Sequence, residues 1–286
     1  MIASVLGFGG SEIGYDRVAV RTVERLLGSA LDAGLNVIDT AECYADGETL
    51  IGKAVGGRRR EFYLFTKCGH ARGWDREDWR PASLLASIER SLKRLLTDHV
   101  DLIQLHSCSL AELQKGDAME ALERARERGL ARSIGYSGDG AAARYAVECG
   151  RFDTLQTSVS VADQEAIELT LPLARSREMG VIAKRPLANV AWRYRRRPES
   201  YYADYWERLR RLDYPFVRDA AGAVGIALRF TLSVPGVHTA IVGTAKAGRW
   251  QENAALLASG ALPADEFEAI RARWREKADP SWEGQI

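Results

Sequence analysis

Hydrophobic and polar positions divide the chain into short apolar runs and longer amphipathic stretches that alternate from end to end. The short runs have the length and the β-branched composition of buried strands. We predict eight strands, at residues 5–8, 37–40, 62–66, 102–105, 133–136, 155–159, 181–183 and 240–242. The stretches between them repeat their apolar positions with the period of a helix, and several run into glycine, which is common just beyond a helix.

The order of these elements favours one fold. Strands that alternate with helices over about 250 residues have the size and rhythm of a (β/α)8 barrel. The alternative is a doubly wound open sheet, whose dinucleotide fingerprint contains a third glycine. Here Gly7 and Gly9 are followed by Glu12 at that position, so the fingerprint is incomplete. No internal repeat or low-complexity linker divides the chain, and we predict a single α/β barrel domain over residues 1–286.

A long segment rich in aromatic and basic residues, 189–215, follows the seventh predicted strand. Loops of this length in compact domains are usually functional or mobile. In a barrel this insertion would lie over the C-terminal mouth, where its aromatic residues could line a substrate pocket. A surface helix and an oligomer contact are the alternatives for part of it. A further helix is predicted at about 220–232, before the eighth strand.

Composition and charge then narrow the class of protein. The chain has 286 residues, of which 46% are hydrophobic, and this is enough for a sizeable core. Its formal net charge of +1 provides no basic field for nucleic acid or an anionic membrane. The apolar runs are far shorter than a membrane span. We therefore predict a cytoplasmic protein that binds neither nucleic acid nor membranes.

The cysteines show neither the spacing of a metal site nor that of a small disulfide framework. We interpret all four as reduced thiols. Cys43, Cys68 and Cys108 lie close in sequence to the polar residues described next. A redox-sensitive site is therefore the alternative to simple burial.

Ionisable residues of different types follow three consecutive predicted strands. Asp39 ends the second strand and Tyr44 follows it, Lys67 ends the third, and His106 ends the fourth. In a barrel, the C-terminal ends of the strands point into the mouth, where active sites lie. Any one of these residues could be structural, as an ion pair, a core histidine or a packed aromatic ring. Their joint occurrence in one layer favours a functional role, because buried charges are costly unless paired.

These groups together suit the protonation of a carbonyl oxygen. A phenol has a pKa of about 10, too high for easy proton transfer near neutral pH, and a neighbouring ammonium lowers it. We predict that Asp39 keeps Lys67 charged, that Lys67 lowers the pKa of Tyr44, and that Tyr44 acts as the general acid. His106 would donate a hydrogen bond to the carbonyl oxygen and orient the substrate.

With these residues the sequence resembles the aldo-keto reductase family. The stretch DTAECYADGETLIGKAV is similar to that family's D-T-A-x-x-Y-G-x-S-E-x-x-x-G signature. FTKCG and VDLIQLHS match its next two strand ends, and the resemblance continues to IVGTAKAGRWQEN near the C-terminus. It implies a (β/α)8 barrel, a nicotinamide cofactor held without a Rossmann fold, and a catalytic tetrad of Asp39, Tyr44, Lys67 and His106.

The resemblance also implies contacts with the cofactor. Ser137 and Gln156 correspond to the residues that hold the carboxamide in the family. Gly243 and Thr244 correspond to its phosphate-binding segment after the eighth strand. These small residues lead into a helix N-terminus, where backbone N–H groups favour an anion.

The remaining implied contacts concern the rest of the cofactor. RWQEN matches the family's R-x-x-E-N run, which implies Arg249 for the adenosine 2′-phosphate and Asn253 for the adenine, and so NADPH rather than NADH. Two residues depart from the family: Gly138 replaces an asparagine, and Lys184 stands where many members have an aromatic ring that stacks on the nicotinamide. Arg185 is also unusual and is a candidate contact for the pyrophosphate.

We therefore predict an NADP(H)-dependent oxidoreductase that reduces an aldehyde or ketone to an alcohol, with Tyr44 as proton donor. Its expected partner is a small carbonyl substrate. The alternative is a cofactor-binding sensor or regulatory barrel with negligible turnover, which Gly138 and Lys184 favour and the intact tetrad opposes.

Two further expectations complete the prediction. A metal-dependent barrel hydrolase would need histidines paired at ligand spacing, and none of the four histidines is so paired. The first predicted strand begins at about residue 5, so the N-terminal hairpin that closes the barrel floor in the family is expected to be short or absent. The sequence leaves the natural substrate and the oligomeric state open.

Overall fold

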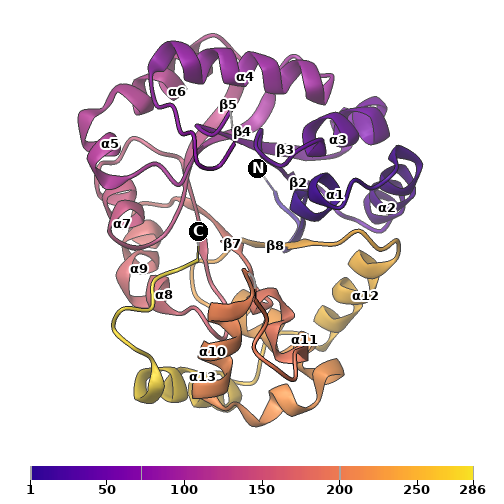
Figure 1. Cartoon of the computed structure of the whole chain (residues 1–286), viewed down its shortest axis with the longest axis vertical. Coiled ribbons are helices and arrows are strands. Elements are labelled where there is room, and N and C mark those ends of the chain that lie inside the picture. Colours follow the sequence, from indigo (N-terminus) through magenta and orange to yellow (C-terminus); the bar gives the residue numbers. More distant parts are fainter. Residues whose placement is uncertain (1, 72, 200, 286) are drawn as a thin grey trace.

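In the computed structural model, which describes residues 2–71, 73–199 and 201–285, parallel strands close into an eight-stranded barrel (Figure 1). Each strand pairs with its successor in sequence, and β8 pairs with β1 to complete the ring. The strands are β1 (Leu6–Gly9), β2 (Val37–Asp39), β3 (Tyr63–Cys68), β4 (Val100–His106), β5 (Ala131–Ser137), β6 (Thr154–Ser158), β7 (Gly180–Lys184) and β8 (Thr239–Gly243). The predicted (β/α)8 barrel is confirmed.

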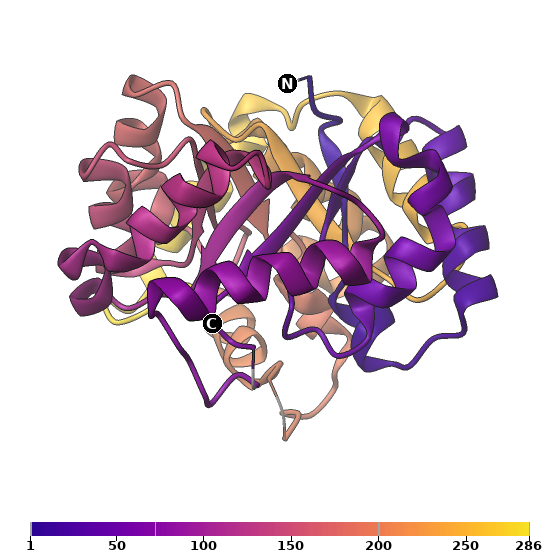
Figure 2. The same cartoon turned by 90° about the horizontal axis from the view of Figure 1, so that it is seen from above.

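Helices follow the strands and enclose the barrel, as Figure 2 shows from a second side. The α-helices are α1 (Ser11–Tyr15), α2 (Val20–Asp32), α3 (Gly47–Val55), α4 (Pro81–Leu95), α5 (Leu110–Lys115), α6 (Asp117–Glu127), α7 (Gly140–Glu148), α8 (Glu165–Leu169), α9 (Leu171–Ser176), α10 (Ala203–Leu212), α11 (Ala220–Ser233), α12 (Arg249–Leu256) and α13 (Ala264–Lys277). Short 3₁₀ helices are η1 (Gly56–Glu61), η2 (Ala188–Arg193), η3 (Pro215–Arg218) and η4 (Leu257–Ser259).

The helices form because their apolar residues share one face. In α2 the buried residues recur at helical spacing, at Val23, Leu26, Leu27, Ala30 and Leu31. They join the large cluster of buried side chains that fills the space between the barrel and the helices. The predicted helix at about 220–232 is confirmed as α11.

A second, smaller cluster lies inside the barrel. Val37, Phe65 and Leu102 come from the neighbouring strands β2, β3 and β4, and Ile182 comes from β7, which meets those three strands only across the lumen. Side chains in a strand alternate between its two faces, so the residue two positions further on faces the lumen as well. The polar residues predicted at the strand ends therefore lie directly above an apolar floor.

The two ends of the barrel differ. The N-terminus lies at one end, and the orange segment that contains α10 lies at the opposite end (Figure 2). Residues 2–5, which precede β1, contain no strand. The segment 189–215 contains most of η2, all of α10 and the first residue of η3. Within the part of the chain that the structure describes, no helix combines the length and the apolar character that crossing a membrane requires.

Candidate active site

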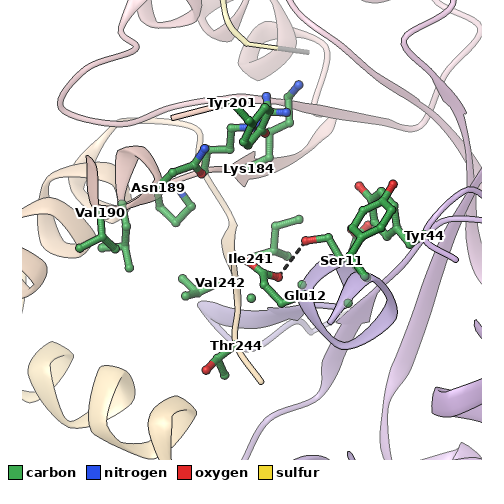
Figure 3. A pocket seen from close by; sticks show the side chains of 18 of the residues that line it. Ser11, Glu12, Tyr44, Lys184, Asn189, Val190, Tyr201, Ile241, Val242 and Thr244 are labelled. Carbon is green, nitrogen blue, oxygen red and sulfur yellow. Dashed lines mark hydrogen bonds between the residues drawn. The ribbon is translucent and has the colours of Figure 1, made fainter. Parts of the chain in front are cut away.

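A cavity of about 750 Å³ opens where the strands end, and Asp39, Tyr44 and His106 line it together. Its walls come from the segments after β1, β2, β3 and β4 and from β5 to β8, and η2 and residues 201–202 line it as well. Figure 3 shows Glu12, Tyr44 and Lys184 pointing toward this space from different walls. The cavity therefore brings together segments that lie far apart in the sequence.

Asp39 and Lys67 form a buried ion pair at the base of the cavity. The Lys67 Nζ donates to Asp39 Oδ2 at 2.5 Å and to the Thr40 carbonyl at 2.9 Å. Both side chains are almost completely buried. A buried ammonium needs such partners to stay charged, so the predicted pairing of these two residues is present.

Tyr44 lies beside this pair, and the Lys67 Nζ is 5.2 Å from the centre of its ring. Burial raises the pKa of Tyr44 well above its usual 10, and the negative charge of Asp39 adds to this effect. The net shift of this pKa is therefore upward, opposite to the lowered pKa that we predicted for Tyr44. The physical reason is that burial removes the water that would stabilise a phenolate, and the phenol keeps its proton at neutral pH.

His106 ends β4 and has an exposed fraction of 6%. Burial lowers its pKa well below 6.5, and the charge of Lys67 acts in the same direction, so the imidazole is neutral at neutral pH. Its ring packs edge-on against Tyr44, with 5.7 Å between ring centres, and against Trp74, with 4.9 Å. The Sγ of Cys43 lies 3.5 Å from its Nδ1.

Ser137 and Gln156 lie on neighbouring strands and both line the cavity. The Ser137 hydroxyl donates to Gln156 Oε1 at 2.9 Å, and the Gln156 amide donates to Asp39 Oδ1 at 2.9 Å. A network of hydrogen bonds thus joins the residues assigned to the carboxamide with the Asp39–Lys67 pair.

The structure gives a reason for the departure at Gly138. A Cβ at this position would overlap the hydroxyl of Tyr136, which donates to the Cys108 carbonyl at 2.8 Å. An asparagine would therefore require this buried tyrosine to move. Gly138 is the residue that the local packing allows.

The second departure, Lys184, lines the cavity and is paired. Its Nζ lies 2.7 Å from Asp139 Oδ2. Burial lowers the pKa of Lys184 to about 8, and the carboxylate of Asp139 opposes this shift. A cation thus stands at the wall where many members of the family have an aromatic ring, and Arg185 beside it also lines the cavity.

The loop after β8 meets an acidic group that sequence reasoning did not assign to the site. Gly243 and Thr244 line the cavity as predicted, and a Cβ at Gly243 would overlap the carboxylate of Glu12. Glu12 accepts a hydrogen bond from the Ser11 hydroxyl at 2.8 Å (Figure 3). Burial raises the pKa of Glu12. No motif identifies Glu12, because it approaches Gly243 only in the folded chain.

Arg249 and Asn253 begin and continue α12, and neither is among the residues that line the cavity. Arg249 is half-exposed and pairs with Glu252 at 3.0 Å. Asn253 is buried. Their contacts with the adenosine end of a cofactor stay predictions.

The insertion contributes only part of its aromatic residues to the cavity. Tyr201 and Tyr202 line it, whereas Tyr205 is buried and donates to Asp163 Oδ2 at 2.7 Å. The indole of Trp206 donates to the Tyr194 carbonyl at 2.9 Å. A cavity residue that sequence reasoning missed is Trp74, in the loop between β3 and α4.

The cysteines near the site are protonated thiols. Burial raises the pKa of Cys43 to about 12 and raises those of Cys68 and Cys108, so these thiols keep their protons and are poor nucleophiles. Among the described residues, no group of three or more His, Cys, Asp and Glu side chains is placed to hold a metal ion.

Comparisons with known proteins show the family and the fold of the chain. The model of the aldo/keto reductase family matches residues 5–275. The chain is 25% identical over 293 residues to an uncharacterised oxidoreductase, YqkF, of Bacillus subtilis, with 93% of each chain covered. It is 25% identical over 279 residues to L-galactose dehydrogenase of Arabidopsis thaliana, with 88% of this chain and 83% of the relative covered. Its structure is similar to that of the aldo-keto reductase AKR11C1 of Bacillus halodurans in its holo form, with a TM-score of 0.80, 25% identity and coverage of 98% and 95%.

Proposed function

The chain is an oxidoreductase of the aldo/keto reductase family, and we propose that it uses NADP(H) to reduce an aldehyde or ketone to an alcohol, reversibly. The observation that carries this proposal is that Asp39, Tyr44 and His106 line one cavity, with Lys67 buried against Asp39 and beside the Tyr44 ring. The relatives with oxidoreductase names do not favour the alternative of a sensor with negligible turnover.

The proposed chemistry centres on the carbonyl oxygen of the substrate. When bound, the nicotinamide supplies the hydride that the carbonyl carbon accepts. Tyr44 gives its phenolic proton to the oxygen, and its raised pKa ensures that this proton is present at neutral pH. The neutral imidazole of His106 donates a hydrogen bond to the same oxygen and fixes its position. Water then returns a proton to Tyr44.

The Asp39–Lys67 pair has an electrostatic role in this proposal. After proton transfer Tyr44 carries a negative charge, and the Lys67 ammonium 5.2 Å from its ring centre stabilises that charge. Asp39 holds the ammonium in place and compensates it in the resting state. The pair therefore favours the transition state over the ground state, which is the requirement for catalysis.

The residues present fit a nicotinamide cofactor. Ser137 and Gln156 place a hydroxyl and an amide at the cavity base, which suit a carboxamide group. Arg185, which follows β7, supplies a cation for the pyrophosphate. Gly243 and Thr244 leave backbone N–H groups near the start of α12.

We assign the adenosine end to α12. Arg249 would bind the 2′-phosphate and Asn253 the adenine, so NADPH is preferred to NADH. The guanidinium of Arg249 supports this assignment, because it is half-exposed. It pairs with Glu252, one helical turn away. Such a pair exchanges readily for a phosphate, because an exposed ion pair contributes little to stability.

The test is NADPH consumption by the purified protein with an activated aromatic aldehyde, compared between wild type and Tyr44→Phe. We expect turnover in the wild type and a loss of at least about 100-fold in the variant, because general acid catalysis is removed. Cofactor affinity, measured by fluorescence titration, should not change.

Tyr63→Phe is the matched control, because Tyr63 begins β3 at the opposite end of the barrel. It should keep full turnover. Full turnover in Tyr44→Phe would overturn the role of Tyr44, and NADPH binding without turnover of any carbonyl would restore the sensor alternative.

A further inference from the structure

We propose that Cys43 is a positioning residue whose thiol holds His106 in the tautomer that carries its proton on Nε2. This inference rests on the proposed function, in which His106 donates a hydrogen bond to the substrate carbonyl. Cys43 is not among the residues that line the cavity, so it would act through His106 and not on the substrate.

Cys43 lies beside one ring nitrogen of the His106 imidazole. Its Sγ lies 3.5 Å from Nδ1, within the range of a hydrogen bond to sulfur. The aromatic rings of Tyr44, His70 and Trp74 also pack edge-on against this ring. Within residues 2–71, 73–199 and 201–285, Cys43 is the residue whose side chain lies within hydrogen-bond distance of a ring nitrogen of His106.

The protonation states of the two side chains decide which one donates. A neutral imidazole has one N–H donor and one bare nitrogen acceptor, and burial keeps His106 neutral. Burial also raises the pKa of Cys43 to about 12, so its sulfur keeps the proton. The S–H is a weak donor and can donate to a bare Nδ1, whereas a protonated Nδ1 would have to donate to a sulfur that is itself a weak acceptor and still carries its proton.

The consequence for the reaction follows from the two ring nitrogens. When Nδ1 accepts from Cys43, the proton of the neutral imidazole must sit on Nε2, where it is available to the carbonyl oxygen. In the other tautomer Nε2 would turn a lone pair toward that oxygen and repel it. Cys43 thus removes a competing state that cannot support the reaction.

The main chain of His106 is fixed separately, which assigns a distinct task to the thiol. The His106 carbonyl contacts His70 Nε2 at 2.7 Å, and Ser107 after it has a φ of 59°, in the left-handed region. These features orient the end of β4, but neither touches the ring nitrogens of His106. The position of the ring proton is left to Cys43.

The test compares Cys43→Ala and Cys43→Ser with wild type in the full chain. Ser keeps an O–H donor and Ala removes it. We expect kcat to fall by about fivefold in Cys43→Ala, the rate equivalent of one neutral hydrogen bond, and to recover in Cys43→Ser. The affinity for NADPH should be unchanged in both. Cys149→Ala, at the far end of α7, is the matched control and should behave as wild type.

A second readout does not depend on turnover. With ¹⁵N-labelled histidine, the NMR signals of His106 should show Nε2 protonated and Nδ1 bare in wild type and in Cys43→Ser. Cys43→Ala should show a mixture of both tautomers.

Two outcomes would overturn the inference. One is a wild-type spectrum with the proton on Nδ1, and the other is an unchanged His106 spectrum in a folded Cys43→Ala protein. Because these spectra are recorded without substrate, the inference can fail while the reductase activity stands, and the activity can fail while the tautomer assignment stands.

Discussion

At the scale of single residues, the carboxylate of Glu12 is the feature that the proposed function explains least. It lies against Gly243, which ends β8 and begins the segment that we assign to the phosphates of the cofactor. Burial already raises its pKa, which shows that an ionised carboxylate is costly at this place. An approaching anionic cofactor would raise that cost further, because like charges repel at short range.

We therefore predict that Glu12→Gln tightens NADPH binding by about fivefold at neutral pH, equivalent to a repulsion of about 1 kcal/mol. Cofactor binding raises the pKa of Glu12 again, so the wild-type complex takes up a proton and its Kd increases as pH rises. This dependence should be reduced in Glu12→Gln. Fluorescence titration between about pH 5 and pH 8 measures both effects.

Glu24→Gln on the outer face of α2 serves as the control and should bind like wild type. Equal affinities for wild type and Glu12→Gln across this pH range would show that Glu12 moves away from the cofactor.

The residues of the site differ in how far the sequence could predict them. Asp39 and Lys67 were predictable, because a strand that ends in a charge is unusual and neighbouring barrel strands bring their ends together. The direction of the pKa shift of Tyr44 was not predictable, since it depends on burial by segments distant in sequence. Glu12 was not predictable either, because only the fold brings it to Gly243.

At the scale of elements, the loop between β3 and α4 links the structure to the choice of substrate. It carries Trp74, which packs against the His106 ring and lines the cavity with 43% of its surface exposed. The buried carboxylate of Glu42 holds the base of the loop, because its Oε1 accepts from the backbone N–H groups of Gly69 and His70 at 2.8 and 3.0 Å. The base of the loop is therefore fixed by hydrogen bonds, and the loop presents an aromatic surface next to His106.

We predict that Trp74→Ala raises KM for an aromatic aldehyde by about fivefold, the loss of roughly 1 kcal/mol from one pair of stacked rings. KM for a small aliphatic aldehyde should change little, since it makes no such contact. Steady-state kinetics with both substrates measures the ratio. An equal change for the two would mean that Trp74 supports His106 and does not contact the substrate.

The sequence predicts the presence of each strand, but not the residues at which the strands begin and end. Each apolar run became a strand, yet the run at 102–105 lies within the longer β4 and the run at 133–136 within β5. The flanking residues, such as Asp101 and Arg132, are polar and gave no strand signal. Asp101 is buried and forms ion pairs with Arg59 and Arg132. These partners come from neighbouring elements, so the strand sequence alone does not reveal them.

At the scale of the whole molecule, the cavity joins the beginning, the middle and the end of the chain. Gly9 ends β1 and Glu12 lies on α1, Gln156 lies on β6, and Thr244 follows β8, where the barrel closes. A ligand that contacts all these segments binds the folded chain and not the unfolded one. Its binding must then stabilise the entire barrel by mass action.

We predict that NADPH at 100 times its Kd raises the melting temperature by about 5 °C, since this excess contributes about 2.7 kcal/mol and each kcal/mol shifts a domain of this size by about 2 °C. NADH at the same concentration should give a smaller shift, because it lacks the 2′-phosphate assigned to Arg249. In Arg249→Ala the two shifts should become equal, with NADPH falling to the level of NADH.

Arg229→Ala is the control: this arginine lies on α11 and donates to the carbonyls of Gly260 and Ala261, away from α12's first turn. If Arg249→Ala keeps the difference between the two cofactors, the 2′-phosphate is bound elsewhere, and the cations that line the cavity, among them Lys246 in the loop after β8, become the candidates.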